Sequence, residues 1–116
     1  TTLFRSLSSD SYLSVEKISK TATCSAALFL GQGSVVKNVS DNGTEYSMGT
    51  LSDAAAGNRY DETVYAIPGI NSCIAVRYFI HYGNIQNYPE GVVREFDEAA
   101  LVREFDRIRH TLVIAP

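Results

Sequence analysis

Hydrophobic and polar residues alternate along several segments of the chain, which is the pattern of a β-strand with one buried face. The segment SYLSVEKIS at 11–19 alternates in this way, and RYDETVYAI at 59–67 is rich in strand-forming residues. SCIAVRYFIHY at 72–82 places apolar side chains on both of its faces, so we expect an internal strand of a sheet. We predict that Pro68-Gly69 ends the strand before it.

Asn42-Gly43 predicts a tight hairpin, because both residues accept the positive φ that a two-residue turn requires. The flanking strands are expected at 34–40 and 44–51. The small residues of DAAAGN at 53–58 predict a loop.

Two segments predict helix. CSAALFL at 24–30 is short and apolar, and we interpret it as a helical turn that ends at Gly31. Asp97 is a suitable N-cap for a longer helix, with Glu98 in its first turn. The apolar residues that follow form one stripe at helical spacing: Leu101, Phe105, Ile108 and Leu112. The charged residues are expected off that stripe, with two i, i+3 pairs among them: Arg103, Glu104, Asp106, Arg107 and Arg109.

This order of elements predicts an α+β fold with an antiparallel sheet of about four to six strands, one face of which a C-terminal amphipathic helix covers. TLVIAP at 111–116 would add a short edge strand. The absence of alternating strands and helices argues against a doubly wound sheet. We expect residues 1–116 to form a single domain.

Composition narrows the class of partner. The chain has 45% hydrophobic residues and a formal net charge of −3, which argues against a nucleic-acid partner. No apolar stretch is long enough for a transmembrane segment. Because the chain begins with Thr1 rather than Met, we expect a processed, exported form (periplasmic, secreted or lipid-anchored) whose signal peptide or lipid anchor has been removed.

The cysteines Cys24 and Cys73 are too far apart for a zinc or redox motif. In an exported protein we expect them to form a disulfide, which would contribute about 4 kcal/mol by closing a long loop. The alternative is two buried thiols in a cytosolic protein.

No catalytic or metal-binding motif is present. The chain lacks the G-x-S-x-G elbow, H-E-x-x-H, C-x-x-C and EF-hand patterns, and its two histidines are His81 and His110. We therefore predict no catalytic residues, no metal and no cofactor. Asn38 and Asn42 match the N-glycosylation pattern, and whether either is ever modified stays open.

Arg77 lies in the middle of the strongest predicted strand. A buried arginine must be paired, and Glu62 on the preceding strand is a plausible partner. The alternative is that the sheet face away from the helix is a binding surface on which Arg77 reads an anion.

The loop after this strand is rich in the tyrosine, asparagine and arginine residues that recognition surfaces favour. Together with the strand it forms our candidate binding surface: Arg77, His81, Tyr82, Asn84, Asn87, Tyr88 and Arg94. The alternative is a long ordered turn whose tyrosine rings cover the start of the helix.

CIAVRYFIHYGN at 73–84 and REFDEAALVREFDRIRHTLVI at 94–114 form a strand, a loop and an amphipathic helix. This succession resembles the end of small exported bacterial α+β domains of the PsbP/Mog1-like group and of lipoprotein-type domains. The resemblance rests on the pattern and carries over no functional residue. It implies a non-catalytic envelope domain that binds a partner.

The functional expectation is therefore an exported bacterial module that binds a protein or an envelope component without chemistry. An alternative is an inhibitor or immunity-type protein that blocks an enzyme with the 81–94 loop. A small enzyme is the third hypothesis.

Overall fold

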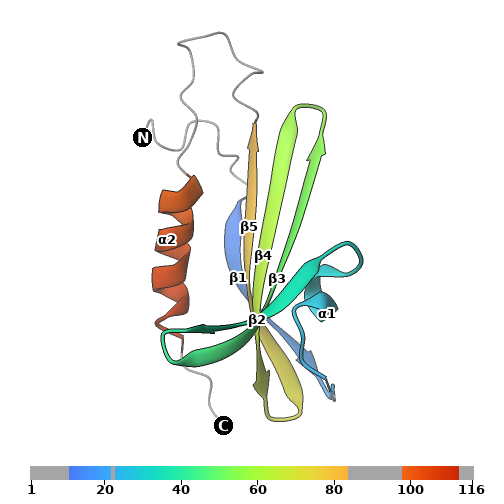
Figure 1. The fold of residues 1–116 in the computed structure, drawn as a ribbon, viewed down its shortest axis with the longest axis vertical. Helices are drawn as coiled ribbons and strands as arrows, with labels where there is room; N and C mark the ends of the chain where they lie inside the picture. The colour runs from blue at the N-terminus through green and yellow to red at the C-terminus, as the bar shows by residue number, and fades with distance from the viewer. Residues whose placement is uncertain (1–10, 22, 84–97, 113–116) are drawn as a thin grey trace.

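The structure is a computed structural model that describes residues 11–21, 23–83 and 98–112 (Figure 1). Within them, five antiparallel strands form one sheet in the order β1-β5-β4-β3-β2. The strands are β1 (Tyr12–Ser19), β2 (Val35–Asp41), β3 (Thr44–Ala55), β4 (Asn58–Gly69) and β5 (Ser72–Gly83). The helices are α1 (Ala27–Leu30) and α2 (Glu98–Arg109). The predicted antiparallel sheet is confirmed, and β5 is internal as expected.

Three tight turns join β2 to β5. Asn42 and Gly43 have φ of 52° and 80°, which confirms the predicted hairpin turn. The predicted loop at 53–58 is wrong, because β3 continues to Ala55 and turns at Ala56 and Gly57, where φ is 52° and 79°. Small residues therefore extend the strand here instead of interrupting it.

The prediction that Pro68-Gly69 ends the strand at residue 67 is wrong. β4 runs through both residues, and Pro68 is opposite Cys73 in β5. The pairing of β4 with β3 stops at Ala66, so the missing N–H of Pro68 costs no hydrogen bond on that side.

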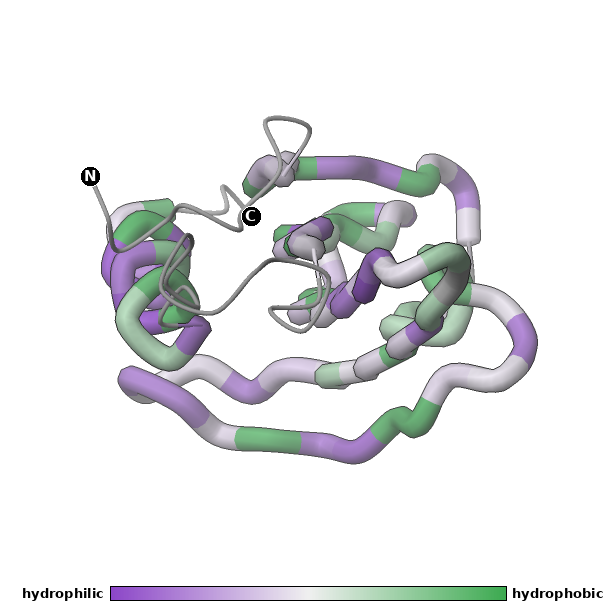
Figure 2. The backbone as a smooth tube through the Cα atoms, turned by 90° about the horizontal axis from the view of Figure 1, so that it is seen from above, coloured by the Kyte–Doolittle hydropathy of each residue, from purple (hydrophilic) through white to green (hydrophobic). Residues whose placement is uncertain are grey.

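The pairing of β4 with β5 is one-to-one from Asn58↔Gly83 to Gly69↔Ser72. Successive side chains of these strands therefore alternate strictly between the two faces of the sheet. We call these the α1 face and the α2 face, after the helix that packs on each. Seen from above, hydrophobic and hydrophilic residues alternate repeatedly along the strands (Figure 2).

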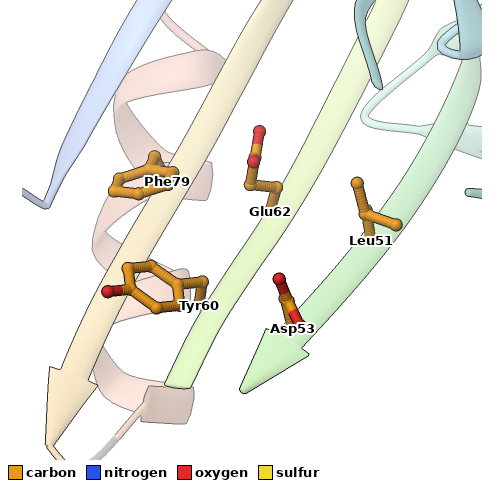
Figure 3. Close-up of a pocket in the computed structure, with 5 residues that line it drawn as sticks. All are labelled: Leu51, Asp53, Tyr60, Glu62 and Phe79. Carbon is orange, nitrogen blue, oxygen red and sulfur yellow. The ribbon is translucent and has the colours of Figure 1, made fainter. Parts of the chain in front are cut away.

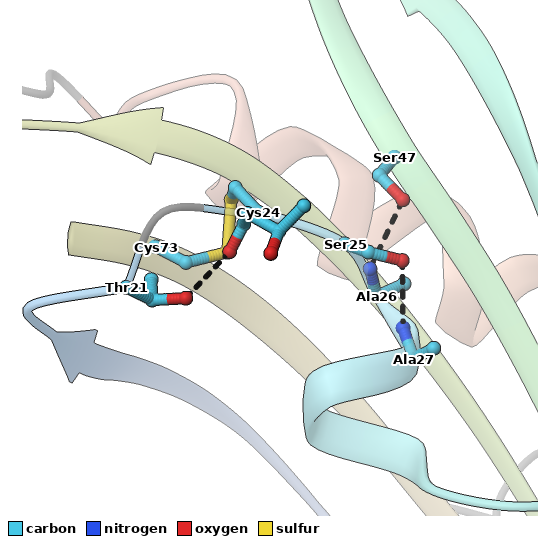
Figure 4. The surroundings of a disulfide bond; sticks show 8 residues. Thr21, Cys24, Ser25, Ala26, Ala27, Ser47 and Cys73 are labelled. Carbon is cyan, nitrogen blue, oxygen red and sulfur yellow. Dashed lines mark hydrogen bonds between the residues drawn. A yellow bond between two sulfur atoms is a disulfide. The ribbon is translucent and has the colours of Figure 1, made fainter.

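On the α1 face, small side chains let α1 approach the sheet closely. The buried cluster consists of Ala26, Val64, Ala66, Cys73 and Ala75. A Cβ atom on Gly49 would lie 2.9 Å from both Ala26 Cβ and Leu30 Cδ1, so no larger residue fits at that position without movement. The Ala26 amide donates to Ser47 Oγ at 3.0 Å and fixes the start of α1 on β3 (Figure 4).

The predicted Cys24–Cys73 disulfide is present beside this cluster, with a Cα–Cα distance of 5.0 Å (Figure 4). It connects the segment before α1 to the start of β5. Because Cys73 is fully buried, the bond lies within the packed part of the α1 face.

On the α2 face, the helix packs against part of the sheet and does not cover it. The cluster there is small and consists of Ile80 and Leu101, with Tyr82, Val102 and Phe105 packed against them. α2 is 12 residues long, so the predicted helix is real, but the prediction that it covers one face is only partly correct. The proposed N-cap, Asp97, lies outside the described residues.

The predicted apolar stripe of α2 is partly wrong. Leu101 is buried, whereas Ile108 and Leu112 are 47% and 40% exposed. Arg109, which we expected on the solvent side, is only 2% exposed. The helix therefore turns a face with Leu101, Phe105 and Arg109 toward the sheet, because the guanidinium finds partners there. The helix ends at Arg109, and the expected strand at 111–116 is absent at 111–112, beyond which it lies outside the described residues.

Replacement of both cysteines by serine should lower the free energy of unfolding by about 4 kcal/mol, because the open chain gains conformational entropy. Urea unfolding of the variant and the parent measures this difference. Intact mass with and without reductant provides the control, and two free thiols in protein from an oxidising compartment would contradict the pairing.

Leu101→Ala should cost about 2–3 kcal/mol, because it removes a buried side chain between α2 and β5. Ile108→Ala is the matched control on the same helix and should change stability by less than about 0.5 kcal/mol. Thermal or urea unfolding measures both. Equal losses for the two variants would show that the orientation of α2 is wrong.

Candidate functional site

Aromatic side chains gather on the part of the α1 face that α1 does not reach. Tyr12, Phe79, Tyr60 and His81 form this aromatic row, which crosses β1, β5 and β4. Tyr12 stacks on Phe79 with ring centroids 5.1 Å apart, and Tyr60 stacks on His81 at 4.2 Å. Phe79 and Tyr60 are in tilted contact at 6.2 Å, which joins the two pairs. Tyr12 is 45% exposed, and Tyr60, Phe79 and His81 are partly exposed among the described residues.

An open hollow lies beside the aromatic row. Its volume is about 270 Å³, and three neighbouring strands supply the side chains that line it: Leu51, Asp53, Tyr60, Glu62 and Phe79. Figure 3 shows these side chains on the same side of the sheet. The hollow thus combines aromatic and aliphatic walls with two carboxylates.

Arg77 lies on the same face, between the aromatic row and α1. Its guanidinium donates to Glu16 at 2.6 and 3.1 Å, to the Phe29 carbonyl oxygen at 2.8 Å, and to Glu62. The hydrogen bonds to Glu16 raise the pKa of Arg77, and those same bonds lower the pKa of Glu16. The predicted pairing with Glu62 is confirmed. Because internal acceptors already occupy this cation, it is poorly placed to read an external anion.

The two faces of the sheet differ in charge. On the α1 face the strands contribute four carboxylates and one base, namely Glu16, Glu45, Asp53 and Glu62 with Arg77. On the α2 face they contribute two carboxylates and three bases, namely Asp41 and Asp61 with Lys17, Lys37 and Arg59. The aromatic row and the hollow therefore lie on the acidic face.

The structure separates the residues of our candidate binding surface. His81 points to the α1 face, where its Nε2 is 3.0 Å from Asn58 Oδ1. Tyr82 points to the α2 face and donates its hydroxyl proton to Asp61 at 3.2 Å. Consecutive residues of one strand cannot share a surface. The remaining loop residues of that surface lie outside the described residues: Asn84, Asn87, Tyr88 and Arg94.

Sequence reasoning missed Tyr12, Tyr60 and Phe79. A signal for one of them was available, because the period of two places Phe79 on the same face as Arg77 and His81. Tyr60 and Tyr12 needed the strand register, which pairs Tyr60 with His81 and Tyr12 with Phe79. That register was not readable before the strand order was known.

A second polar cluster surrounds Arg109 on the α2 face. Its guanidinium donates to the Tyr78 hydroxyl at 2.8 Å, to Asp41 at 2.6 Å and to Asp106 at 3.2 Å. Its Cζ lies 3.9 Å from the Tyr65 ring centroid. The side chain is buried and paired, so this cluster holds α2 to the tip of the β2–β3 hairpin and does not form an open site (Figure 1).

Other kinds of site find no support in the described residues. Within them, no three His, Cys, Asp or Glu side chains gather as metal ligands would. None of the described helices combines the length and the apolar character needed to cross a membrane. His110 Nε2 is 2.9 Å from Asp41 and belongs to the Arg109 cluster.

Comparisons with protein-family models, with curated proteins and with solved structures found no match. The residues and geometry of this chain are therefore the basis for its proposed function.

At the start of α2, a carboxyl pair joins the helix to β4. Burial, followed by a hydrogen bond to Asp61, raises the pKa of Glu98 to about 7. Arg59 opposes this shift. The Tyr82 hydroxyl also donates a hydrogen bond to Asp61.

This pair predicts a pH dependence of stability. The pKa of Glu98 is higher in the folded chain than in the unfolded one, so its contribution is fully present near pH 4 and is lost as pH rises to about 7. Glu98→Gln keeps a hydrogen-bond donor for Asp61 and should stabilise the chain at pH 8. We expect a gain of about 1 kcal/mol, because Glu98 is partly exposed and solvent screens the interaction.

Urea unfolding at pH 4, 6 and 8 measures this effect. Glu45→Gln, at an exposed position, is the charge-matched control and should show no comparable gain. A Glu98→Gln variant that is no more stable than the parent at pH 8 would contradict the raised pKa of Glu98.

Proposed function

We propose that the chain is an exported, non-catalytic binding module that recognises a partner protein or an envelope component through the aromatic row and the adjoining hollow. The observation that carries this proposal is the aromatic row itself. Three strands bring Tyr12, Phe79 and Tyr60 together, and among the described residues all three keep part of their surface exposed. Aromatic side chains gathered on an open surface are typical of interfaces.

The disulfide supports an exported location. Disulfides persist in oxidising compartments and are rare in the reducing cytosol. Such a bond also suits a small domain whose hydrophobic core is divided between two faces, as it is here. A non-catalytic envelope module is also what the resemblance to the PsbP/Mog1-like group implies.

The side chains around the aromatic row favour binding over chemistry. Arg77 holds Glu62, and His81 lies against Tyr60 with Asn58 beside it. Ser11 Oγ hydrogen-bonds the backbone N–H and carbonyl of His81, and these backbone groups do not act as the base that activates a nucleophile. The alternative of an inhibitory 81–94 loop falls mainly outside the described residues, so no observation favours it.

The proposal is tested by affinity capture from an envelope extract, with variants that each alter one ring of the aromatic row. Tyr12→Ser and Tyr60→Ser should each retain at least about tenfold less of a specific partner than the parent does, because aromatic residues dominate interface energies. Val35→Ser, at an exposed position of the edge strand β2, should retain the partner.

Circular dichroism of each variant shows whether the fold is kept. The proposal fails if no specific partner is retained, or if folded Tyr12→Ser and Tyr60→Ser variants retain it as well as the parent does.

A further inference from the structure

We propose that the hollow beside the aromatic row binds a cationic side chain of a partner protein, arginine in preference to lysine. This inference rests on the proposed function and names the chemistry of its ligand. In this proposal the walls of the hollow contact the apolar stem of that side chain, and the Asp53 carboxylate pairs with its positive charge.

Charge complementarity is the first argument. Arg77 pairs with Glu62 and Glu16, whereas Asp53 forms no ion pair with a described residue. The Oδ1 atom of Asp53 accepts a hydrogen bond from the Ala54 amide at 2.8 Å, and the side chain is exposed. No strand of the described sheet places a second lysine or arginine on this face, so no described base compensates the negative charge of Asp53 at the rim of the hollow.

The walls are the second argument. Leu51 and Phe79 offer apolar surface to a flexible stem, and long basic side chains bury their stems in this way. Tyr60 and Phe79 line the same hollow, and a guanidinium stacks on an aromatic side chain more readily than an ammonium does. Aromatic faces together with a carboxylate therefore favour arginine.

The same features disfavour an anionic ligand. A phosphate or carboxylate in the hollow would meet Asp53 and Glu62, and the nearby cation Arg77 already has internal acceptors. A neutral sugar would use the rings but would not need the charge of Asp53. Dependence on that charge thus separates a cationic side chain from a sugar.

The test is an NMR titration of the full chain with Nα-acetyl-arginine methylamide, and with the neutral isostere Nα-acetyl-citrulline methylamide as the matched probe. We expect the arginine probe to shift the Leu51, Asp53 and Tyr60 amides with millimolar affinity, as suits a single side chain. The citrulline probe should bind at least about tenfold more weakly, because it lacks the charge.

Asp53→Asn should weaken binding of the arginine probe at least about fivefold, and 0.5 M salt should weaken binding to the parent. Glu45→Gln removes the same charge at the distant end of the same strand and face, so it should bind the probe as the parent does. Both variants change one exposed side chain, and their spectra show whether the fold is kept.

The inference is overturned if the citrulline probe binds as well as the arginine probe, if folded Asp53→Asn is unaffected, or if no probe shifts these amides at 100 mM. It is also overturned if the neutral trisaccharide maltotriose shifts them and the arginine probe does not. Any of these results would overturn the arginine proposal alone. The proposed function would still hold if Tyr12→Ser and Tyr60→Ser reduce the capture of a partner. Loss of that dependence would remove the proposed function as well.

Discussion

The unbroken register between β4 and β5 is the constraint on which the rest of the molecule depends. Twelve residues of each strand pair one-to-one, so every second side chain goes to the opposite face. This alternation sends Cys73 to the disulfide and Tyr78 to α2. It also sends Phe79 and Tyr60 to one open surface. A slip by one residue would exchange the two faces and destroy both clusters of the core.

Each face then uses one arginine to join elements that are distant in sequence. Arg77 connects β1, β4 and the end of α1, while Arg109 connects α2 with the β2–β3 hairpin. Both guanidinium groups have several acceptors, which offset the cost of removing a charge from water. Removal of either guanidinium would leave the carboxylates around it without their cationic partner.

The sequence was enough to predict the strands, the Asn42-Gly43 turn, the disulfide and the Arg77–Glu62 pair. The strands and the turn depend on local sequence pattern, and the two pairs depend on the chemistry of a cysteine or of a buried arginine. The orientation of α2 could not, because hydrophobicity alone places an arginine toward solvent. Arg109 can be buried because Asp41 and Tyr78 accept hydrogen bonds from its guanidinium. The aromatic row was hidden for a similar reason, since the rings of Tyr12 and Tyr60 meet Phe79 only through the strand order.

The disulfide also determines how the molecule would carry a mechanical load. Cys24 and Cys73 close a loop that contains α1, β2, β3 and β4. Tension applied between the two ends of the chain would pass from β1 through the sulfur atoms directly into β5. Residues 25–72 would bear none of that tension and could not be extended while the bond is intact. The strands that supply Leu51, Asp53, Tyr60 and Glu62 therefore lie inside a segment that tension between the two ends of the chain does not extend.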